Sequence, residues 1–481
     1  LGQPVDREHI IGFGGFFARV TQQREIRFVR FGKFNILFNW VNAGHKVALC
    51  EQTESPEDAK KARGSNALVT RDVMRLYTGG TLTEDNLLPT DAPKLLVALT
   101  GSGAKLALAS LNLAEGTVTH QSLTPVSLAA ELSALNPAEL LTTQQNAEKL
   151  NEILAPYSVT LADDFTKKSH LLEQQNIVTQ LTSQEKTALN TVLNYAHHTQ
   201  KGKLPPLHIV QEEDAITYLT LDATTRTHLE LTENFRGEKQ GSLLWAIDKT
   251  VTNPGARLLR NWLTRPLTHL PTLNARLDCI EELRSNLPTV HTIREHLKPT
   301  TDLARALSRL ALGRGSPRDV ASLRNTLIQL PRLQKATPKL TSDLIQKHTR
   351  KLTGLEALTH TLIKAIKTED LPHLTRDGGF LQAGFNPEFD KLNSLKTNGL
   401  KLLQELEQRE QTAAGIPLKL KYNKVWGYFL EVTKAHVKNI PDHFIHRQTT
   451  TNSTRFSTTE LMTLERDLAA ASTKTLEKEL E

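Results

Sequence analysis

Two helical patterns that flank a short basic segment constrain this fold more than any other feature. Apolar residues recur at three-to-four spacing from Phe389 to Gln411, and the same spacing returns from Thr459 to Glu481. Between them, residues 418–422 (LKLKY) alternate apolar side chains with lysines, as in a half-buried strand with a charged outer face. The pattern predicts two helices that carry a basic β tip toward a polyanion.

Length and composition favour a multidomain globular protein. The chain has 481 residues, enough for about three domains, with 38% apolar and 23% charged residues. The net charge of +7 favours a nucleic-acid or acidic partner only where the charge clusters. Cys50 and Cys279 lie far apart without metal-ligand spacing, which is typical of reduced thiols in a cytosolic protein. The sequence contains no apolar run of membrane-spanning length and no signal-peptide pattern, so we expect no membrane partner.

The pattern of helix and strand signals changes along the chain. Residues 1–88 mix strand and helix signals, and residues 89–200 place strands before helices, as in a compact α/β domain. A Gly- and Pro-containing stretch at 201–206 reads as a linker, and residues 215–389 read as packed helices. Proline or glycine is expected to interrupt the helical pattern at Pro254, Pro266, Pro271, Gly313, Pro317 and Pro331.

Catalytic signals are absent from the sequence. A P-loop requires Gly-x4-Gly-Lys-Ser/Thr, and the Gly-Lys pairs at 32–33 and 202–203 lack both the earlier glycine and the hydroxyl. Histidines at 197–198, 436, 443 and 446 lack metal-site spacing, and Asp163-Asp164 reads as a solvated turn. We therefore predict no catalytic, nucleotide-binding or metal-binding residues and no enzyme activity in this chain.

The segment from 415 to 458 holds many cations and few acids. Amide and hydroxyl residues accompany these cations, a mixture suited to phosphate oxygens, although a solvated basic loop would have the same composition. Trp426, Tyr428 and Phe429 allow two interpretations, because aromatic rings at strand spacing either stack on bases or form the core of a hairpin. The basic residues of the segment are Lys419, Lys421, Lys424, Lys434, Lys438, Arg447 and Arg455.

Several runs together resemble one family. KLKYNKVWGYFLEVT (419–433) and FIHRQTTTNSTRF (444–456) closely resemble the DNA clamp of the MutS family of mismatch-repair proteins. Four further runs are similar to other MutS segments and follow in family order. They span Gly44 to Leu88, Leu221 to Leu267, Asp302 to Val320 and Asp377 to Leu392.

The resemblance implies a multidomain fold with α/β N-terminal domains and a mainly α-helical core, into which a β-rich clamp is inserted between two long helices. It assigns residues 1–88 to a mismatch-recognition-like domain and 89–200 to an RNase H-like connector. The core and outgoing lever helix would take 201–414, the clamp 415–458 and the returning lever 459–481. The resemblance implies phosphate contacts from the clamp residues Lys421, Asn423, Lys434, Arg447, Gln448 and Arg455.

The resemblance also implies partners and a cofactor. MutS proteins bind mismatched duplex DNA, act as dimers and recruit a protein of the MutL family. Their ATP and Mg belong to a C-terminal ATPase domain, before which this chain is expected to stop, so we expect neither in this chain. A cytoplasmic, nucleoid-associated protein of bacteria is expected.

Three positions depart from the family pattern. MutS proteins read mismatches with Phe-x-Glu, in which the aromatic ring wedges into a base step. Phe16 is the candidate wedge, but Ala18 stands where the glutamate belongs, and a second alignment, slightly favoured, places 10–18 on a later loop. Gly79 replaces an expected proline, and Thr451 replaces a usual basic or polar clamp residue.

Two alternative functions remain open at this stage. A helical scaffold could present the basic tip to an acidic protein, in which case binding would follow that protein and survive nuclease treatment. A recombination-type MutS paralogue would bind branched DNA without reading mismatches, which Ala18 favours and the well-matched run 44–88 opposes.

Overall fold

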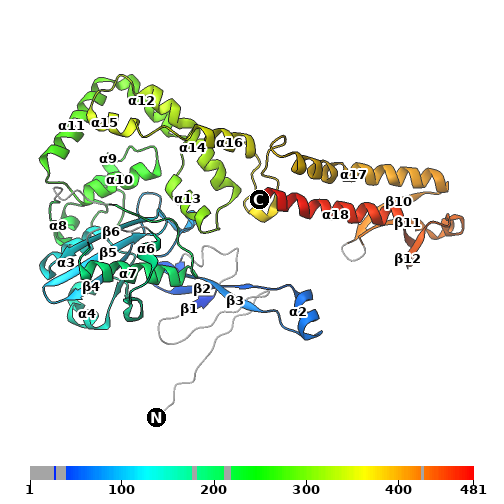
Figure 1. Ribbon diagram of the computed structural model, residues 1–481, viewed down its shortest axis with the longest axis horizontal. Coiled ribbons are helices and arrows are strands. Elements are labelled where there is room, and N and C mark those ends of the chain that lie inside the picture. Colours follow the sequence, from blue (N-terminus) through cyan, green and yellow to red (C-terminus); the bar gives the residue numbers. More distant parts are fainter. Residues whose placement is uncertain (1–25, 29–38, 176–180, 211–217, 424–426) are drawn as a thin grey trace, which may run out of the picture. The chain divides into compact units, whose positions relative to one another are not determined.

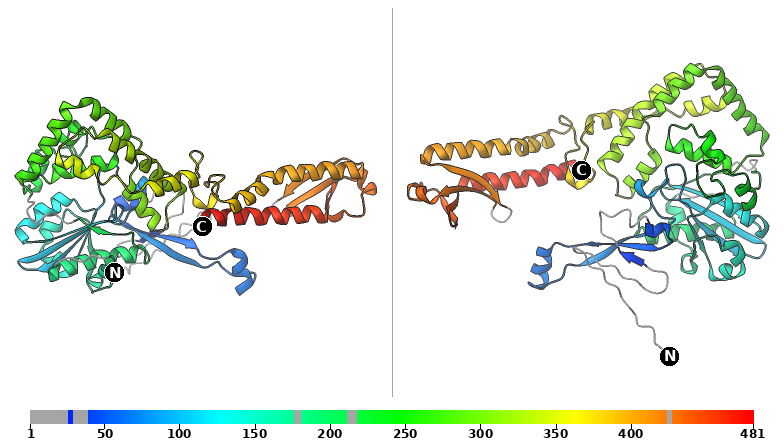
Figure 2. Two further views of the ribbon diagram at one scale, coloured as in Figure 1. Left: turned by 45° about the horizontal axis from the view of Figure 1, so that its top comes forward. Right: turned by 180° about the vertical axis from the view of Figure 1, so that it is seen from behind.

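The computed structural model describes residues 26–28, 39–175, 181–210, 218–423 and 427–481. The chain divides into two compact units (Figures 1 and 2), of which the first joins residues 1–315 to 322–355. The second unit joins residues 316–321 to 356–481. The order of elements confirms the multidomain fold expected from the sequence. Sheets with α/β character come first, helices follow, and a β-rich sheet lies near the C-terminus.

A three-stranded sheet opens the first unit. β2 (Lys46–Gln52) lies between β1 (Ile26–Phe28), which is parallel to it, and β3 (Arg71–Tyr77), which is antiparallel. The β2–β3 ribbon carries a short helix, α2 (Pro56–Arg63), which begins where the Ser55 hydroxyl accepts the Asp58 amide. The mixture of strand and helix signals expected over residues 1–88 corresponds to these elements.

A six-stranded sheet forms the centre of the first unit, in the order β8-β7-β4-β5-β6-β9. β4, β5 and β6 form an antiparallel meander, whereas β7, β8 and β9 join their neighbours in parallel. Its outermost strand β9 lies beyond residue 200, at which the sequence interpretation ended this region. The strands are β4 (Leu96–Ser102), β5 (Lys105–Asn112), β6 (Thr117–Leu123), β7 (Glu139–Thr142), β8 (Val159–Leu161) and β9 (His208–Ile209).

Helices cover both faces of this sheet (Figure 1). Leu96 and Ala98 of β4 pack with α7 (Ser183–Thr199), whereas Val97 and Leu99 pack with α3 (Pro125–Leu135) on the opposite face. A strand that is buried on both sides reads as a continuous apolar run, because successive side chains point to opposite faces. The other short helices of this region are α4 (Gln144–Lys149), α5 (Asn151–Leu154) and α6 (Leu171–Gln174), with 3-10 turns at η1 (Asp85–Leu87) and η2 (Asp163–Phe165).

A series of helices follows the sheet, and prolines begin several of them. Pro254, Pro271 and Pro317 lie in the first turn, where a missing amide N–H costs nothing. The expected interruption at Pro331 is wrong, because α14 continues through it and loses only the bond to the Leu327 carbonyl. The helices are α8 (Ala223–His228), α9 (Leu243–Ile247), α10 (Asn253–Thr264), α11 (Leu270–Ser285), α12 (Leu287–Leu297), α13 (Leu303–Ala311), α14 (Pro317–Ala336) and α15 (Asp343–Thr349).

Buried arginines join these helices to the six-stranded sheet. Arg257 of α10 forms ion pairs with Glu115 (2.7 Å), in the loop after β5, and with Asp302 (2.6 Å), the N-cap of α13. Arg305 donates to the Pro89 carbonyl at 3.0 Å, and both arginine side chains are less than a tenth exposed. Buried charges of this kind require partners, so these contacts hold α10 and α13 in one arrangement against the sheet.

The second unit consists of long helices and a four-stranded sheet. α17 (Pro387–Ala414) and α18 (Thr459–Leu480) run side by side (Figure 2), and the sheet lies at one end of this pair. The sheet has the order β10-β11-β13-β12 and is antiparallel throughout. The remaining elements are α16 (Glu356–Ala365), η3 (Thr375–Asp377), β10 (Leu418–Asn423), β11 (Gly427–Thr433), η4 (Lys434–Asn439), β12 (Ile445–Thr449) and β13 (Ser453–Ser457).

Within the described part of the chain, every helix is too short or too polar to cross a membrane.

Candidate nucleic-acid interface

The sheet between α17 and α18 is built on a core that the two helices provide. Leu403 and Leu406 of α17 and Leu461 of α18 are almost completely buried against Leu430 and Val432 of β11. The strand residues alternate, so that even-numbered β11 side chains face the helices and odd-numbered ones face away. The sheet is therefore a rigid platform with one outer face.

Carboxylates of the helices bind the strand backbone. The Leu420 amide of β10 donates to Glu407 Oε1 (2.9 Å) on α17, and the Tyr428 amide donates to Glu465 Oε1 (3.1 Å) on α18. Gly427 makes the second contact possible, because its φ of 72° suits glycine and any Cβ would collide with the Glu465 carboxylate. These bonds occupy a backbone donor of the edge strand β10 and one of β11 at a position beyond its pairing with β13.

One further pair holds the β-sheet region to α17, and another joins the two helices. His443 Nε2 lies 2.9 Å from Glu410 Oε2 of α17, whose carboxylate is buried. Arg409 of α17 lies 2.5 Å from Glu460 of α18 across the helix pair. The exposed Arg409 pair contributes little to stability, whereas the buried Glu410 needs its partner.

The outer face carries a row of polar residues across the strands. Direct antiparallel pairs place Lys419, Glu431, Arg455 and Gln448 side by side on this face. Lys421 reaches diagonally to form an ion pair with Glu431, and Ser453 Oγ donates to the same carboxylate at 2.8 Å. These hydrogen bonds, first that from Lys421, hold the pKa of Glu431 below its ordinary value. Glu431 therefore stays ionised at neutral pH and orients the Lys421 side chain.

Arg455 is oriented by three neighbours. Its Nη1 donates to Gln448 Oε1 at 2.8 Å, and its guanidinium carbon lies 4.6 Å from the centroid of the Phe429 ring. Glu431 lies on the directly paired strand position. A planar guanidinium held in this way presents its remaining N–H groups in a fixed direction, which suits oxyanion recognition.

Three predicted contact residues lie at the margins of this face. Arg447 occupies a β-bulge between His446 and Gln448, and a bulge re-aims its side chain away from the regular alternation. Arg447 and Lys434 of η4 are both exposed, and within the described residues neither forms an ion pair. Asn423, at the end of β10, is half-buried and makes an interaction of its own.

The structure thus brings Lys421, Gln448 and Arg455 together and leaves Arg447 and Lys434 apart from them. Sequence reasoning missed Glu431, because strand register decides which acid faces which lysine. The candidate wedge Phe16, together with Lys424 and Trp426, lies outside the described residues.

The aromatic residues that the structure describes have packing roles. Phe429 is 3% exposed beneath Arg455, and Tyr428 packs against the helix-side core with its ring 5.0 Å from that of Tyr422. Their interpretation as a hairpin core is confirmed. Phe429 lies too deeply beneath Arg455 to stack on a base in this arrangement.

Two histidines of the basic β-sheet region have partners within the protein. Within the described residues, no three His, Cys, Asp or Glu side chains gather in a metal-binding arrangement. His443 contacts Glu410, and His446 Nε2 lies 2.9 Å from Thr449 Oγ1.

Comparison with known proteins identifies two matching family models. MutS domain III matches residues 224–479, which include the whole sheet and both of its helices, and MutS domain I matches residues 33–86. Three curated relatives, each named DNA mismatch repair protein MutS, match 92% of this chain and 52% of their own length. They come from Roseobacter denitrificans (35% identity over 466 residues), Ruegeria sp. TM1040 (37% over 464) and Caulobacter vibrioides (35% over 469). The chain therefore spans about half the length of the curated relatives it matches.

Proposed function

Because this chain belongs to the MutS family, we propose that it acts in DNA mismatch repair and binds duplex DNA through the outer side of the β10–β13 sheet. One observation carries this proposal. The family match includes a rigid sheet, held by two long helices, whose outer side combines oriented cations with exposed ones. Phosphate contacts of this kind position a protein on DNA without reading its sequence.

The proposed contacts divide into two kinds. Arg447 and Lys434 are exposed and reach phosphates without breaking an internal pair. Lys421 and Arg455 already have partners, so they would bind through their remaining donors, with Gln448 and Asn423 as polar neighbours. We expect the first kind to contribute most of the salt-dependent affinity, because each would release counterions from the DNA.

We further propose the domain roles that the family implies. Residues 1–88 would belong to mismatch recognition, 89–200 to the connector, 201–414 to the core and outgoing lever, 415–458 to the clamp and 459–481 to the returning lever. ATP and Mg would act through a P-loop domain of the kind that the family carries, because neither Gly-Lys pair of this chain has that motif. Dimerisation, recruitment of a MutL-family protein and a nucleoid-associated location in bacteria belong to the same proposal.

A salt titration tests the clamp assignment. Binding of a labelled duplex is measured by fluorescence anisotropy at several salt concentrations, for the natural chain and for Lys434→Ala with Arg447→Ala. The double variant should bind more weakly and lower the slope of log K against log salt by about 2, at about 0.9 per lost phosphate contact. The control Lys105→Ala with Lys149→Ala removes the same charge from exposed positions of the six-stranded sheet region and should leave the slope nearly unchanged.

Equal slopes for the double variant and the natural chain would refute the clamp assignment. Matched, mismatched and branched DNA in the same assay separate a mismatch-binding protein from a recombination-type paralogue. The scaffold alternative is not favoured by the relatives, whose names specify mismatch repair.

A further inference from the structure

A pocket in the first unit is not used by the proposed DNA contact. It has a volume of about 340 Å³, at the lower end of the range for small-molecule sites. One wall comes from 41–42, 44–46 and 78–79, at the end of the three-stranded sheet, and the other from 94, 138–139 and 158–160 of the six-stranded sheet region. Any occupant would therefore touch both sheet regions.

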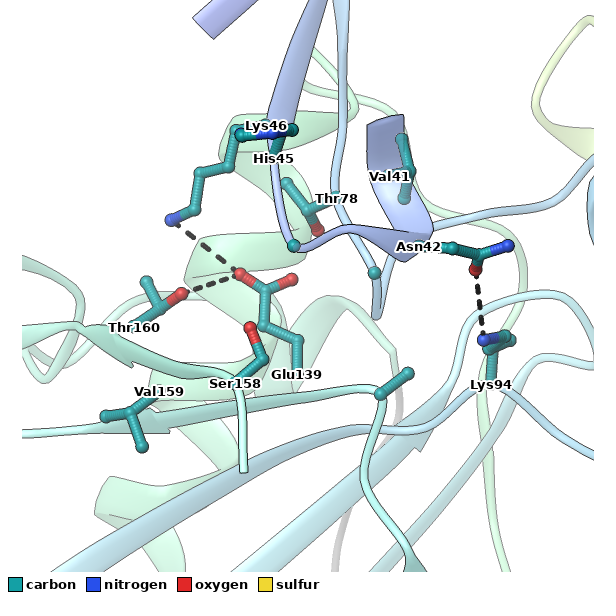
Figure 3. A pocket seen from close by; sticks show the side chains of 13 residues that line it. Val41, Asn42, His45, Lys46, Thr78, Lys94, Glu139, Ser158, Val159 and Thr160 are labelled. Carbon is teal, nitrogen blue, oxygen red and sulfur yellow. Dashed lines mark hydrogen bonds and ion pairs between the residues drawn. The ribbon is translucent and has the colours of Figure 1, made fainter. Parts of the chain in front are cut away.

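On one side of the pocket, Glu139 has partners within the protein, among them Lys46 and Thr160 (Figure 3). The Glu139 carboxylate is 2% exposed and accepts hydrogen bonds from Tyr195 Oη (2.6 Å), Thr160 Oγ1 (2.8 Å) and the Gly80 amide (3.3 Å). Lys46 Nζ lies 3.7 Å from the same carboxylate. Lys46 and Glu139 thus largely balance each other's charge.

The opposite side has an excess positive charge. Lys94 Nζ donates to Asn42 Oδ1 at 3.4 Å (Figure 3), and among the described residues it has no carboxylate partner. Burial lowers the pKa of Lys94, and no neighbouring acid offsets this effect. A partly buried ammonium without a counter-charge is costly, and an anion in the pocket would relieve that cost.

Main chain forms part of the wall between these two sides. Gly79, which stands where the family resemblance expects proline, faces the Ala138 carbonyl so closely that a Cβ would lie 2.6 Å from its oxygen. A side chain at 79 would push this wall apart. The present shape of the pocket therefore depends on a residue that departs from the family pattern.

We propose that this pocket binds a small phosphate-bearing molecule of about mononucleotide size, with its phosphate at Lys94 and the Asn42 amide group. The body of the ligand lies toward the Ser158 hydroxyl, which can donate or accept a hydrogen bond, and toward Thr160 Oγ1, which donates to Glu139 and can therefore only accept from a ligand. Lys94 supplies a point charge of the kind that binds phosphate in other sites, and the small volume excludes a nucleic-acid strand. Binding would also stiffen the junction between the two sheet regions.

Calorimetric titration of the complete chain tests the proposal with three probes: adenosine 5′-monophosphate, inorganic phosphate and adenosine. The monophosphate should bind saturably, inorganic phosphate at least tenfold more weakly, and adenosine without measurable heat. Lys94→Gln should weaken monophosphate binding at least tenfold, whereas Lys105→Gln, an exposed lysine of β5, should not change it. Adenosine binding as tight as that of the monophosphate, or no saturable binding of any probe, would overturn the proposal.

A second variant covers the case in which Lys94→Gln fails to fold. Asn42→Asp changes an exposed side chain and places a carboxylate beside the Lys94 ammonium, so it should abolish monophosphate binding while the circular dichroism spectrum stays native. Unchanged affinity in this variant would contradict the site. Duplex binding through the β10–β13 sheet should be the same in all of these variants, so failure of the pocket proposal leaves the proposed function standing.

Discussion

Gly399 of α17 packs directly against Leu468 of α18: a Cβ atom at position 399 would lie 2.3 Å from Leu468 Cδ2. A side chain at position 399 would force Leu468 to shift, so the two helices approach each other closely here because residue 399 has none. Glycine inside a helix costs about 1 kcal/mol relative to alanine. The close approach of α17 and α18 offsets this cost.

Gly399→Ala should therefore destabilise the second unit by about 1–3 kcal/mol, in spite of the better helix propensity of alanine. Urea unfolding followed by circular dichroism measures the change. In combination with Leu468→Ala, which removes the clashing methyl groups, Gly399→Ala should cost much less than it does alone. If Gly399→Ala alone were more stable than the natural chain, the helix propensity of alanine would outweigh the steric cost, and the packing between α17 and α18 at this point would be loose.

Glu479 fixes the loop that precedes α17. Its buried carboxylate accepts the Gly379 amide at 2.7 Å and the Leu381 amide at 3.0 Å. Glu479→Gln turns an NH₂ group toward one of these donors and should lower the free energy of unfolding by about 1–3 kcal/mol. Glu477→Gln, on the exposed side of the same helical turn, is the control and should have almost no effect.

Glu282 of α11 should confer an acid-sensitive contribution to stability. Hydrogen bonds from the backbone amides of Thr341 and Ser342 lower its pKa from the ordinary 4.5 to about 2. Because the folded pKa lies below the unfolded one, the contribution is complete above about pH 5 and disappears as the pH falls toward 2. Carbon-detected NMR titration of the carboxyl group measures this pKa directly.

The matched variant for this contact is Glu282→Gln. It should lose the extra stability at neutral pH and show a flatter dependence on pH between about 5 and 2. A measured Glu282 pKa near 4.5 would mean that the carboxylate does not accept these amide hydrogen bonds in solution.

Glu431 should limit DNA binding by holding Lys421. Glu431→Gln removes one negative charge from the outer face and releases the Lys421 ammonium from its ion pair. Duplex affinity should rise, and the salt slope should steepen by about 1 as Lys421 becomes available to a phosphate. Asp442→Asn, at an exposed acid of the same tip, is the control. An equal gain in both variants would indicate a general charge effect without a role for the Lys421 pair.

Local sequence signals predicted elements well where they needed no distant partner. Helix α3 (Pro125–Leu135) depends on such signals, because Thr124-Pro125 begins it and Asn136, with φ of 44°, ends it. The alternation at 418–422 likewise predicted β10, with Leu418 buried and Leu420 partly buried against the helices. Pro331 was misjudged because the bulk of α14 remains helical around one missing hydrogen bond.

In the candidate interface, too, the sequence predicted local features but did not predict contacts between distant segments. The cations between two helical patterns predicted the location and the positive charge of this interface. The sequence did not predict that Lys421 pairs with Glu431 or that Arg455 pairs with Gln448. These pairs depend on strand register and on the bulge at Arg447, which are set by chain segments that are distant in sequence.

By itself the sequence determined the family of this protein, many of its helices and strands, and the basic segment between α17 and α18, because motifs, periodicity and capping are local properties. Only the tertiary structure decided which charges are paired and which remain exposed. It also assembled the pocket that joins Lys94 and Asn42 to Glu139, far away along the chain. Contacts between distant segments depend on register and packing, which no local pattern contains.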